Sequence, residues 1–227
     1  MNPELKIVET ADGSNTIYNA QVGENYHSKN GALQESRHVF LNSGLIYFLE
    51  NSPATNNVSV LEVGFGTGLN FLLTAGFCTE NGINLNYTGI EAYPLSDKMI
   101  SETGYEQYVA APVWDNFIKK YPDSLTSEVE LNHQCKLQVA NCKLEDFNTD
   151  KRFDIIYFDA FAVAHQPEMW DEDAISHTIR FLKLGGVFVT YAITGNLKRT
   201  LKALDCKIEK VQGAAGKREM MRAVKIS

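Results

Sequence analysis

The sequence predicts an α/β fold in which a mostly parallel sheet carries helices on both faces. Apolar runs typical of buried strands alternate with helix-like segments from residue 58 to residue 204, and a glycine-rich turn joins the first strand to its helix. A strand, a helix and a second strand in this order usually form a parallel pair with the helix packed on the sheet. The chain has 227 residues, enough for one such domain with a substantial core.

The first 45 residues differ in character from the rest. Polar and apolar residues alternate around Asp12-Gly13, a dipeptide that favours a hairpin turn. Within residues 31–50, apolar side chains then recur at helical intervals, although Gly44 weakens the middle of that helix. We expect a small hairpin-plus-helix cap, residues 1–45, in the same globule as a main domain of residues 46–227.

The main domain is expected to contain five strands and five helices before its last segment. The strands cover residues 58–64, 85–92, 135–141, 153–161 and 187–192; the helices cover 67–80, a segment after Pro94, 112–121, 168–182 and 195–204. The C-terminal residues resemble two strands around a glycine-rich turn, which predicts an antiparallel hairpin at the sheet edge.

Composition excludes several classes of protein. No apolar run approaches the roughly 18 residues that a membrane-spanning helix needs, and the N-terminus lacks the pattern of a signal peptide, so we expect a cytoplasmic protein without a membrane partner. The four cysteines form no C-x-x-C pair and the five histidines show no ligand spacing. We therefore predict neither a disulfide framework nor a bound metal.

Charge is distributed unevenly along the chain. Residues 198–227 hold nine Lys or Arg and three acids, a net charge of +6, whereas the other 197 residues carry −13. Two explanations fit this run of basic residues: a solvated helix followed by an edge strand, or a surface that binds a polyanion.

The stretch "VLEVGFGTGLN", residues 60–70, predicts a binding site for a cofactor. Glycines after a strand let the backbone turn tightly and let a ligand approach its N–H groups. The pattern is not the G-x-G-x-x-G of dinucleotide sites and suits a ligand without a phosphate at this point. The candidate cofactor contacts here are Glu62, Gly64, Phe65, Gly66 and Gly68.

Two further strand ends extend this site. Glu91 ends the strand over 85–92, where a carboxylate can accept hydrogen bonds from both hydroxyls of a ribose. Asn141 ends the next strand and could bond an adenine edge through its amide, or be an ordinary loop residue. The glycine turn, Glu91 and the topology together resemble the class I S-adenosyl-L-methionine-dependent methyltransferases over residues 58–225. This implies a Rossmann-like fold, S-adenosyl-L-methionine as donor and S-adenosyl-L-homocysteine as product.

Three stretches resemble the methyltransferase domain of the MnmC/MnmD family: "NYHSKNGALQESRHVFLNSGL", "YFDAFAVAHQPEMW" and "GKREMMRA". Members methylate the amine of 5-aminomethyl-(2-thio)uridine at the tRNA wobble position, giving 5-methylaminomethyl-(2-thio)uridine. Bifunctional members add a flavin-dependent oxidoreductase domain. Here we expect a stand-alone form without FAD, whose substrate comes from a separate oxidoreductase. Val163 departs from the family, which usually has proline there, and Asn141 replaces an acid.

The resemblance gives the remaining candidates their roles. Asp159 would hold the amine and could take up its proton, although an aspartate at a strand end often caps a helix. Phe161 would flank the base, or simply pack. Tyr26 would close over the cofactor. Lys217 and Arg218, in the terminal hairpin turn, would contact tRNA phosphates within the basic C-terminal region.

Two other functional hypotheses stay open. A polyamine aminopropyltransferase-like enzyme shares the core, an N-terminal hairpin and an aspartate after the fourth strand. A non-catalytic module could bind the cofactor and RNA without turnover.

Overall fold

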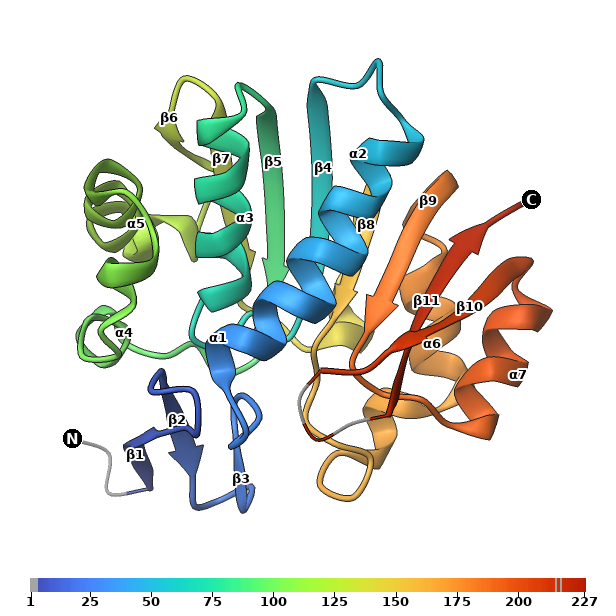
Figure 1. The fold of residues 1–227 in the computed structure, drawn as a ribbon, viewed down its shortest axis with the longest axis horizontal. Helices are drawn as coiled ribbons and strands as arrows, with labels where there is room; N and C mark the ends of the chain where they lie inside the picture. The colour runs from blue at the N-terminus through green and yellow to red at the C-terminus, as the bar shows by residue number, and fades with distance from the viewer. Residues whose placement is uncertain (1–3, 215, 217) are drawn as a thin grey trace.

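The computed structural model describes residues 4–214, 216 and 218–227. Within them, eight strands form one sheet in the order β10-β11-β9-β8-β4-β5-β7-β6 (Figure 1). The parallel strands are β4 (Asn57–Val63), β5 (Asn84–Ile90), β7 (Cys135–Ala140), β8 (Phe153–Phe158) and β9 (Leu182–Thr190). The antiparallel strands are β6 (Val129–Asn132), β10 (Cys206–Gln212) and β11 (Glu219–Lys225). The predicted α/β fold and its terminal antiparallel hairpin are confirmed.

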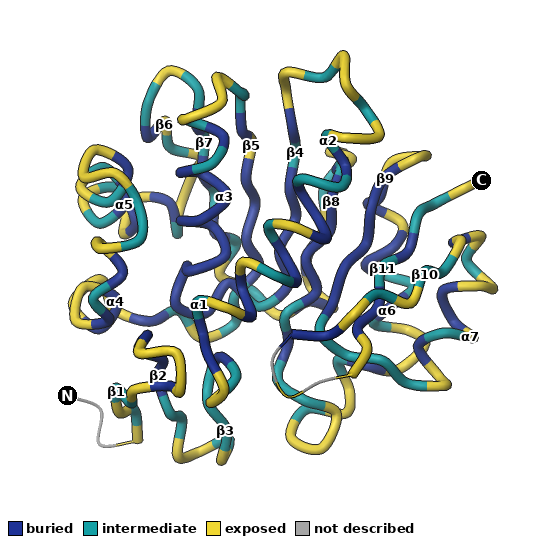
Figure 2. The backbone as a smooth tube through the Cα atoms, in the orientation of Figure 1, coloured by how far each residue is buried: buried dark blue, intermediate teal, exposed yellow. Residues whose placement is uncertain are grey.

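Helices cover both faces of this sheet. They are α3 (Leu69–Glu80), α4 (Asp97–Ser101), η2 (Tyr105–Tyr108), α5 (Ala111–Ser124), η3 (Leu144–Asp146), η4 (Pro167–Trp170), α6 (Glu172–Ile179) and α7 (Gly195–Ala203). Along β8, Ile155 and Tyr157 join the core beneath α3 and α5, whereas Ile156 and Phe158 join the core beneath α6 and α7. Both faces are thus buried, which explains the almost continuous apolar run of this strand. Figure 2 shows the central strands buried along most of their length.

Some predicted elements need correction. Strand β6, absent from the prediction, pairs with β7 at the sheet edge. The helix expected over residues 168–182 is divided into η4 and α6 by Asp171, whose carboxylate caps α6 by accepting from the Ala174 N–H at 2.8 Å. Residues 185–186 belong to β9 itself, beside a register shift between β8 and β9.

The N-terminal segment forms a second, three-stranded sheet. Strands β1 (Leu5–Glu9) and β2 (Asn15–Asn19) are the predicted hairpin, and β3 (Glu24–Asn25) adds to β2. One continuous helical segment follows: α1 (Ala32–Glu35), η1 (Ser36–Ile46), which has wider π-type turns, and α2 (Tyr47–Asn51). It packs on the main sheet beside α3 (Figure 1). The boundary expected at residue 45 therefore falls inside a helix that belongs to the main core.

His27 attaches the three-stranded sheet to the main domain. Its Nδ1 lies 3.0 Å from the Thr16 hydroxyl on β2, and its Nε2 lies 3.5 Å from the Thr67 hydroxyl in the glycine turn. The side chain is only 9% exposed, and burial lowers the pKa of His27 to about 4. The neutral imidazole is thus the form that the folded protein favours.

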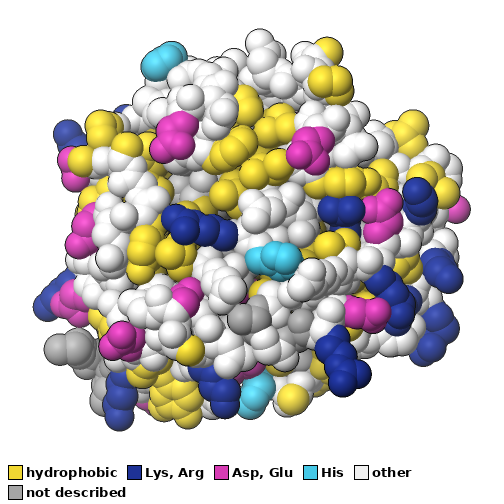
Figure 3. Space-filling view, in the orientation of Figure 1, with side chains coloured by type: hydrophobic (Ala, Val, Ile, Leu, Met, Phe, Trp, Pro, Cys, Tyr) yellow, Lys and Arg dark blue, Asp and Glu magenta, His cyan; other side chains and the backbone are white. Residues whose placement is uncertain are grey.

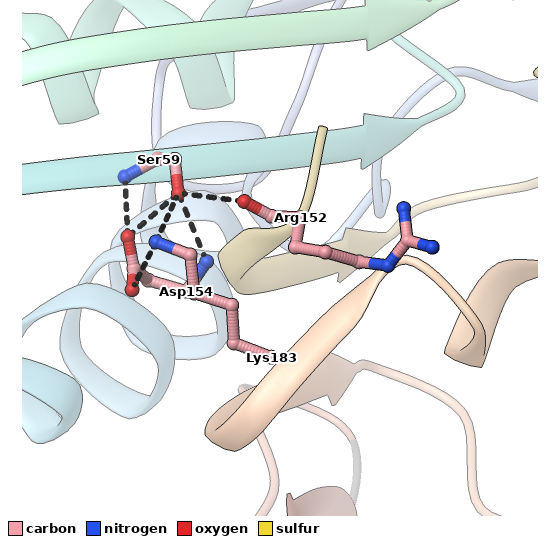
Figure 4. Close-up of polar contacts among 4 residues, drawn as sticks. All are labelled: Ser59, Arg152, Asp154 and Lys183. Carbon is pink, nitrogen blue, oxygen red and sulfur yellow. Dashed lines mark hydrogen bonds and ion pairs between the residues drawn. The ribbon is translucent and has the colours of Figure 1, made fainter. Parts of the chain in front are cut away.

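A polar cluster ties the opposite, amino end of the sheet together. The Asp154 carboxylate accepts from the Ser59 N–H at 2.8 Å and from the Ser59 hydroxyl at 2.6 Å (Figure 4). The Lys183 ammonium lies 2.9 Å from the same carboxylate. These contacts join β4, β8 and β9 where they begin, far from the edge at which they end. None of the helices in the described part of the chain is both long enough and apolar enough to cross a membrane.

Gly44 brings the N-terminal helix close to the sheet. A Cβ at this position would lie 2.8 Å from the Tyr157 ring and 3.0 Å from a Val189 methyl carbon. The close packing of the helix on the sheet therefore requires glycine at residue 44. This packing offsets the low helix propensity of glycine.

We predict that Gly44→Ala lowers the free energy of unfolding by about 1–3 kcal/mol, because overpacking a buried contact outweighs the gain in helix propensity. Gly195→Ala is the control, since a Cβ there meets only the flexible end of Arg199. Chemical denaturation of both variants measures the effect. Equal stabilities of the two variants would contradict the packing argument.

His27 predicts a pH dependence of stability. Its pKa is about 4 in the folded protein and about 6.5 when unfolded, so the unfolded state binds the additional proton between these values. The contribution of His27 is complete above pH 6.5 and is lost as pH falls toward 4. The stability gap between wild type and His27→Gln should narrow by about 3 kcal/mol over that window. A stability gap between wild type and His27→Gln that stays constant from pH 6.5 to pH 4 would refute the assignment.

Candidate active site

An open cleft lies at the carboxyl ends of the parallel strands. Its volume is about 1420 Å³, and it is bounded by the loops after β4, β5, β7 and β8 and by the three-stranded sheet. Typical small-ligand pockets measure roughly 300–1,000 Å³, so the cleft has room for more than one small ligand. The sequence-predicted residues that line it are Tyr26, Gly64, Phe65, Gly66, Glu91, Asn141, Asp159 and Phe161.

The glycine turn and Asp159 touch through their backbones. The Asp159 N–H donates to the Val63 carbonyl at 2.8 Å. Gly64 has φ +86°, and a Cβ on it would lie 2.4 Å from the Asp159 carbonyl oxygen. Only glycine fits both constraints, so the absence of a side chain at 64 brings the ends of β4 and β8 together. The structure thus brings the glycine turn and Asp159 into direct contact at one edge of the sheet.

Glu91 is held at the end of β5 by backbone donors. Its two carboxylate oxygens accept from the Gly66 N–H at 2.9 Å and from the Tyr93 N–H at 3.0 Å. Burial raises the pKa of Glu91, and these donors oppose the increase. Each carboxylate oxygen can accept a further hydrogen bond, so the side chain remains able to receive ligand hydroxyls.

Glu62 and Gly68 occupy different places from those expected. Glu62 is 0% exposed and does not line the cleft, because it points into the core beneath the turn. Its carboxyl group accepts from the Asn70 amide and the Tyr87 hydroxyl, each at 2.8 Å, and burial raises its pKa well above the usual range. Gly68, with φ +77°, starts α3 and faces the Phe117 ring. The structure therefore places both residues behind the cleft, as supports of the turn.

Two aromatic rings close one side of the cleft. The Tyr26 ring lies over Gly66, where a Cβ would be 2.9 Å from it. Tyr26 and Phe161 meet edge to face, with ring centroids 5.2 Å apart at 66°. Phe161 thus packs against Tyr26 and also lines the cleft. Trp170 is buried, as expected for a packing residue, and its indole N–H donates to the Phe161 carbonyl at 2.8 Å.

The loop after Asp159 is fixed by contacts that the sequence did not indicate. The Tyr191 hydroxyl donates to the Ala160 carbonyl at 2.8 Å. The Ala162 N–H donates to the Glu24 carboxylate at 3.0 Å, and this bond joins the loop to β3. The Val163 side chain, at the departure from the family pattern, is exposed. The three-stranded sheet is therefore a wall of the site.

Asn70 is the functional candidate that the sequence reasoning missed. Its amide nitrogen donates to the Glu62 and Asp159 carboxylates, each at 2.8 Å. Its position in the sequence could have indicated it, because Asn70 follows the glycine turn directly and lies in the first turn of the next helix. Asn141 lies exposed at the rim of the cleft, next to the Lys143–Glu145 ion pair of 3.4 Å.

The cleft is acidic. Among the described residues its lining includes two lysines, Lys98 and Lys143, and each lies within 4.0 Å of an acid that also lines it. The acids that line it are Glu4, Glu91, Glu102, Glu145, Asp159, Glu168, Asp171 and Asp173. Such a lining attracts cations and disfavours phosphate groups inside the cleft.

The comparisons agree with this geometry. The bifunctional protein MnmC of tRNA 5-methylaminomethyl-2-thiouridine biosynthesis from Acinetobacter baylyi is 28% identical over 95% of this chain and 37% of its own length. The Marinomonas sp. protein of the same name is 30% identical over 88% of this chain and 31% of its own. The chain thus spans about a third of these relatives.

Solved structures and family models extend the comparison. The crystal structure of MNMC2 from Aquifex aeolicus matches 98% of this chain and 72% of that chain, with TM-score 0.76 and 25% identity. The predicted resemblance and the class I methyltransferase fold are therefore confirmed. Residues 108–226, more than half of the chain, match the family described as S-adenosyl-L-methionine-dependent methyltransferase. The chain therefore belongs to the S-adenosyl-L-methionine-dependent methyltransferase family.

Proposed function

We propose that this chain transfers a methyl group from S-adenosyl-L-methionine to the amine of 5-aminomethyl-(2-thio)uridine at the tRNA wobble position. The product would be 5-methylaminomethyl-(2-thio)uridine. The observation that carries the proposal is Asp159, whose backbone is held against the glycine turn and which lines an acidic cleft. The names of the relatives support the same tRNA modification.

The residues at the cleft fit the donor. Gly64 and Gly66 have positive φ angles and no side chains, so an amino-acid end can lie over the backbone at these two residues. Glu91 would accept the ribose hydroxyls, Asn141 would meet the adenine edge, and Tyr26 would cover the turn. When bound, S-adenosyl-L-methionine supplies a methyl group on a positively charged sulfur, open to attack by an uncharged amine.

Asp159 would prepare that amine. A primary amine carries a proton at neutral pH, so the acidic lining favours its entry as a cation. It must be uncharged to attack, and it loses another proton after the new N–C bond has formed and the S–C bond has broken. Asp159 can orient the amine by a hydrogen bond and accept a proton. Phe161 would flank the uracil ring.

Replacement of Asp159 tests this role. We expect Asp159→Asn to lower kcat/KM for methyl transfer to tRNA by at least about 100-fold, because positioning and proton acceptance are both weakened. Labelled donor and tRNA from cells blocked at the aminomethyl stage provide the assay. Asp154→Asn, at the other end of β8, is the matched control and should reduce stability while leaving kcat unchanged. Unchanged turnover in Asp159→Asn would remove the assignment.

The acidic cleft also favours a second candidate function. A polyamine is a cation, so an aminopropyltransferase-like enzyme fits the same lining. Incubation with decarboxylated S-adenosyl-L-methionine and putrescine separates the two functions, since turnover there without turnover on tRNA would select the polyamine enzyme.

A phosphate-binding surface would lie beside the cleft, on α7. In the C-terminal region, Lys207 and Arg222 pair with Glu209, Lys210 pairs with Glu219, and Lys225 donates to two backbone carbonyls. The described cations of this region that have no ion pair are Lys198, Arg199, Lys202, Arg218 and Lys225, and the first three lie on α7. Lys217, the other residue expected to contact phosphate, lies outside the described residues. Lys and Arg side chains gather over α7 and β10 at the right of Figure 3.

We predict that Arg199→Ala/Lys202→Ala weakens tRNA binding and reduces the slope of log Kd against log salt by about 1–2, as expected for the loss of one or two phosphate contacts. Lys207→Ala/Lys210→Ala changes the net charge equally but removes cations already paired with acids. Fluorescence anisotropy over a salt series measures both. Equal slopes for the two double variants would argue against α7 as the RNA surface.

The aminomethyl acceptor must come from a different reaction. We propose that a separate oxidoreductase supplies it, because methyl transfer consumes an aminomethyl group and does not form one. The proposed reaction itself needs neither FAD nor a metal ion.

A further inference from the structure

Asn70 links two carboxyl groups through one nitrogen atom. It is the second residue of α3, and its side chain is buried, with 3% exposed. The Nδ2 atom donates one hydrogen to Glu62 Oε1 and the other to Asp159 Oδ2, each at 2.8 Å. Both N–H groups of the amide are therefore used on acids.

The orientation of this amide is determined by those acids. Its Oδ1 is buried and has no hydrogen-bond partner among the described residues. A reversed amide would turn Oδ1 toward the two acids and withdraw both Nδ2 hydrogen bonds from them. A buried acceptor without a partner is unfavourable, and its retention points to a function for the two hydrogen bonds on the other side.

Glu62 provides a rigid support for Asn70. It lies on β4, just before the glycine turn, and its second oxygen accepts from the buried Tyr87 hydroxyl at 2.8 Å. A chain of hydrogen bonds thus runs from β5 through Glu62 and Asn70 to the Asp159 side chain at the end of β8. Asp159 lines the cleft and is held from behind by this chain.

We propose that Asn70 is a positioning residue for Asp159 and that Glu62 is its anchor. The inference rests on the proposed function, in which Asp159 orients the acceptor amine. Asparagine suits the task because it supplies two N–H groups from one atom without a charge. Serine has a single O–H to donate. Lysine would add a positive charge where the amine and the sulfonium are both cationic. A donor to the charged carboxylate also favours that form of Asp159.

Asn70→Ala tests the proposal, with Asn81→Ala as the matched control. Asn81 caps the end of the same helix, is exposed, and its side chain donates to the Phe77 carbonyl of that helix. We expect Asn70→Ala to reduce kcat about 10- to 100-fold, with the Kd for S-adenosyl-L-methionine changed less than about twofold. The acidic limb of the pH profile should move to higher pH, because Asp159 loses a donor to its charged form. A lower Tm with unchanged kcat and pH profile would show a purely structural role and overturn the proposal.

A readout without turnover separates this inference from the proposed function. Carbon-13 NMR of the aspartate carboxyl groups, assigned with Asp159→Asn, follows the Asp159 titration directly. Asn70→Ala should raise that pKa whether or not tRNA is the substrate, and an unmoved titration would overturn the inference. Failure of the wild type to methylate tRNA would overturn the proposed function alone.

Glu62 supplies a conservative variant. Glu62→Gln keeps an oxygen that accepts from Asn70 and has nearly the same shape, so kcat should stay within about fivefold of wild type. Glu62→Leu removes the acceptor and should approach the loss seen for Asn70→Ala. Equal kcat values for the two Glu62 variants would contradict the anchoring role.

Discussion

The close backbone contact between Gly64 and Asp159 is the constraint on which the site depends. Two neighbouring parallel strands end side by side, and glycine lets one turn away while the other delivers its aspartate. A side chain at residue 64 would collide with the Asp159 carbonyl and separate the two loops. The Asp159 N–H then donates to the end of β4, and the Asp159 carboxylate accepts from the Asn70 amide. The fold thus sets the proposed donor and acceptor groups at one edge of the sheet.

Opposite charges are kept on separate surfaces. The cleft is lined by carboxylates, whereas Lys198, Arg199 and Lys202 on α7 have no acidic partner among the described residues. Phosphates of a bound RNA would be repelled from the cleft and attracted to the helix beside it. The turn between β9 and α7 is tied to the Asp159 loop by Tyr191, so the two surfaces keep a fixed relation. With tRNA as the proposed substrate, this arrangement would let an acidic protein bind a polyanion while one amine enters the cleft.

The sequence predicted what depends on strand ends and missed what depends on long-range side-chain bonds. Glu91 and Asp159 follow buried strands, and parallel strands must end at one edge, so their convergence could be inferred. The buried position of Glu62 could not be inferred from the sequence. A charged residue in a strand is rarely fully buried unless it has partners there, and the partners Asn70 and Tyr87 are known only from the structure. From the sequence alone, Gly44 is expected to weaken its helix. Its packing role could not be inferred, because the Tyr157 ring that it accommodates lies more than a hundred residues away in the sequence. His27 joins segments whose contact only the folded chain shows.

Methylation of the wobble aminomethyl group is the central claim, and nucleoside mass spectrometry of tRNA tests it most directly. Wobble nucleosides would be compared between cells with and without the gene for this chain. The account predicts loss of 5-methylaminomethyl-uridine, with or without the 2-thio group, and build-up of the aminomethyl form. An unchanged nucleoside profile in cells with no other enzyme for this step would contradict it.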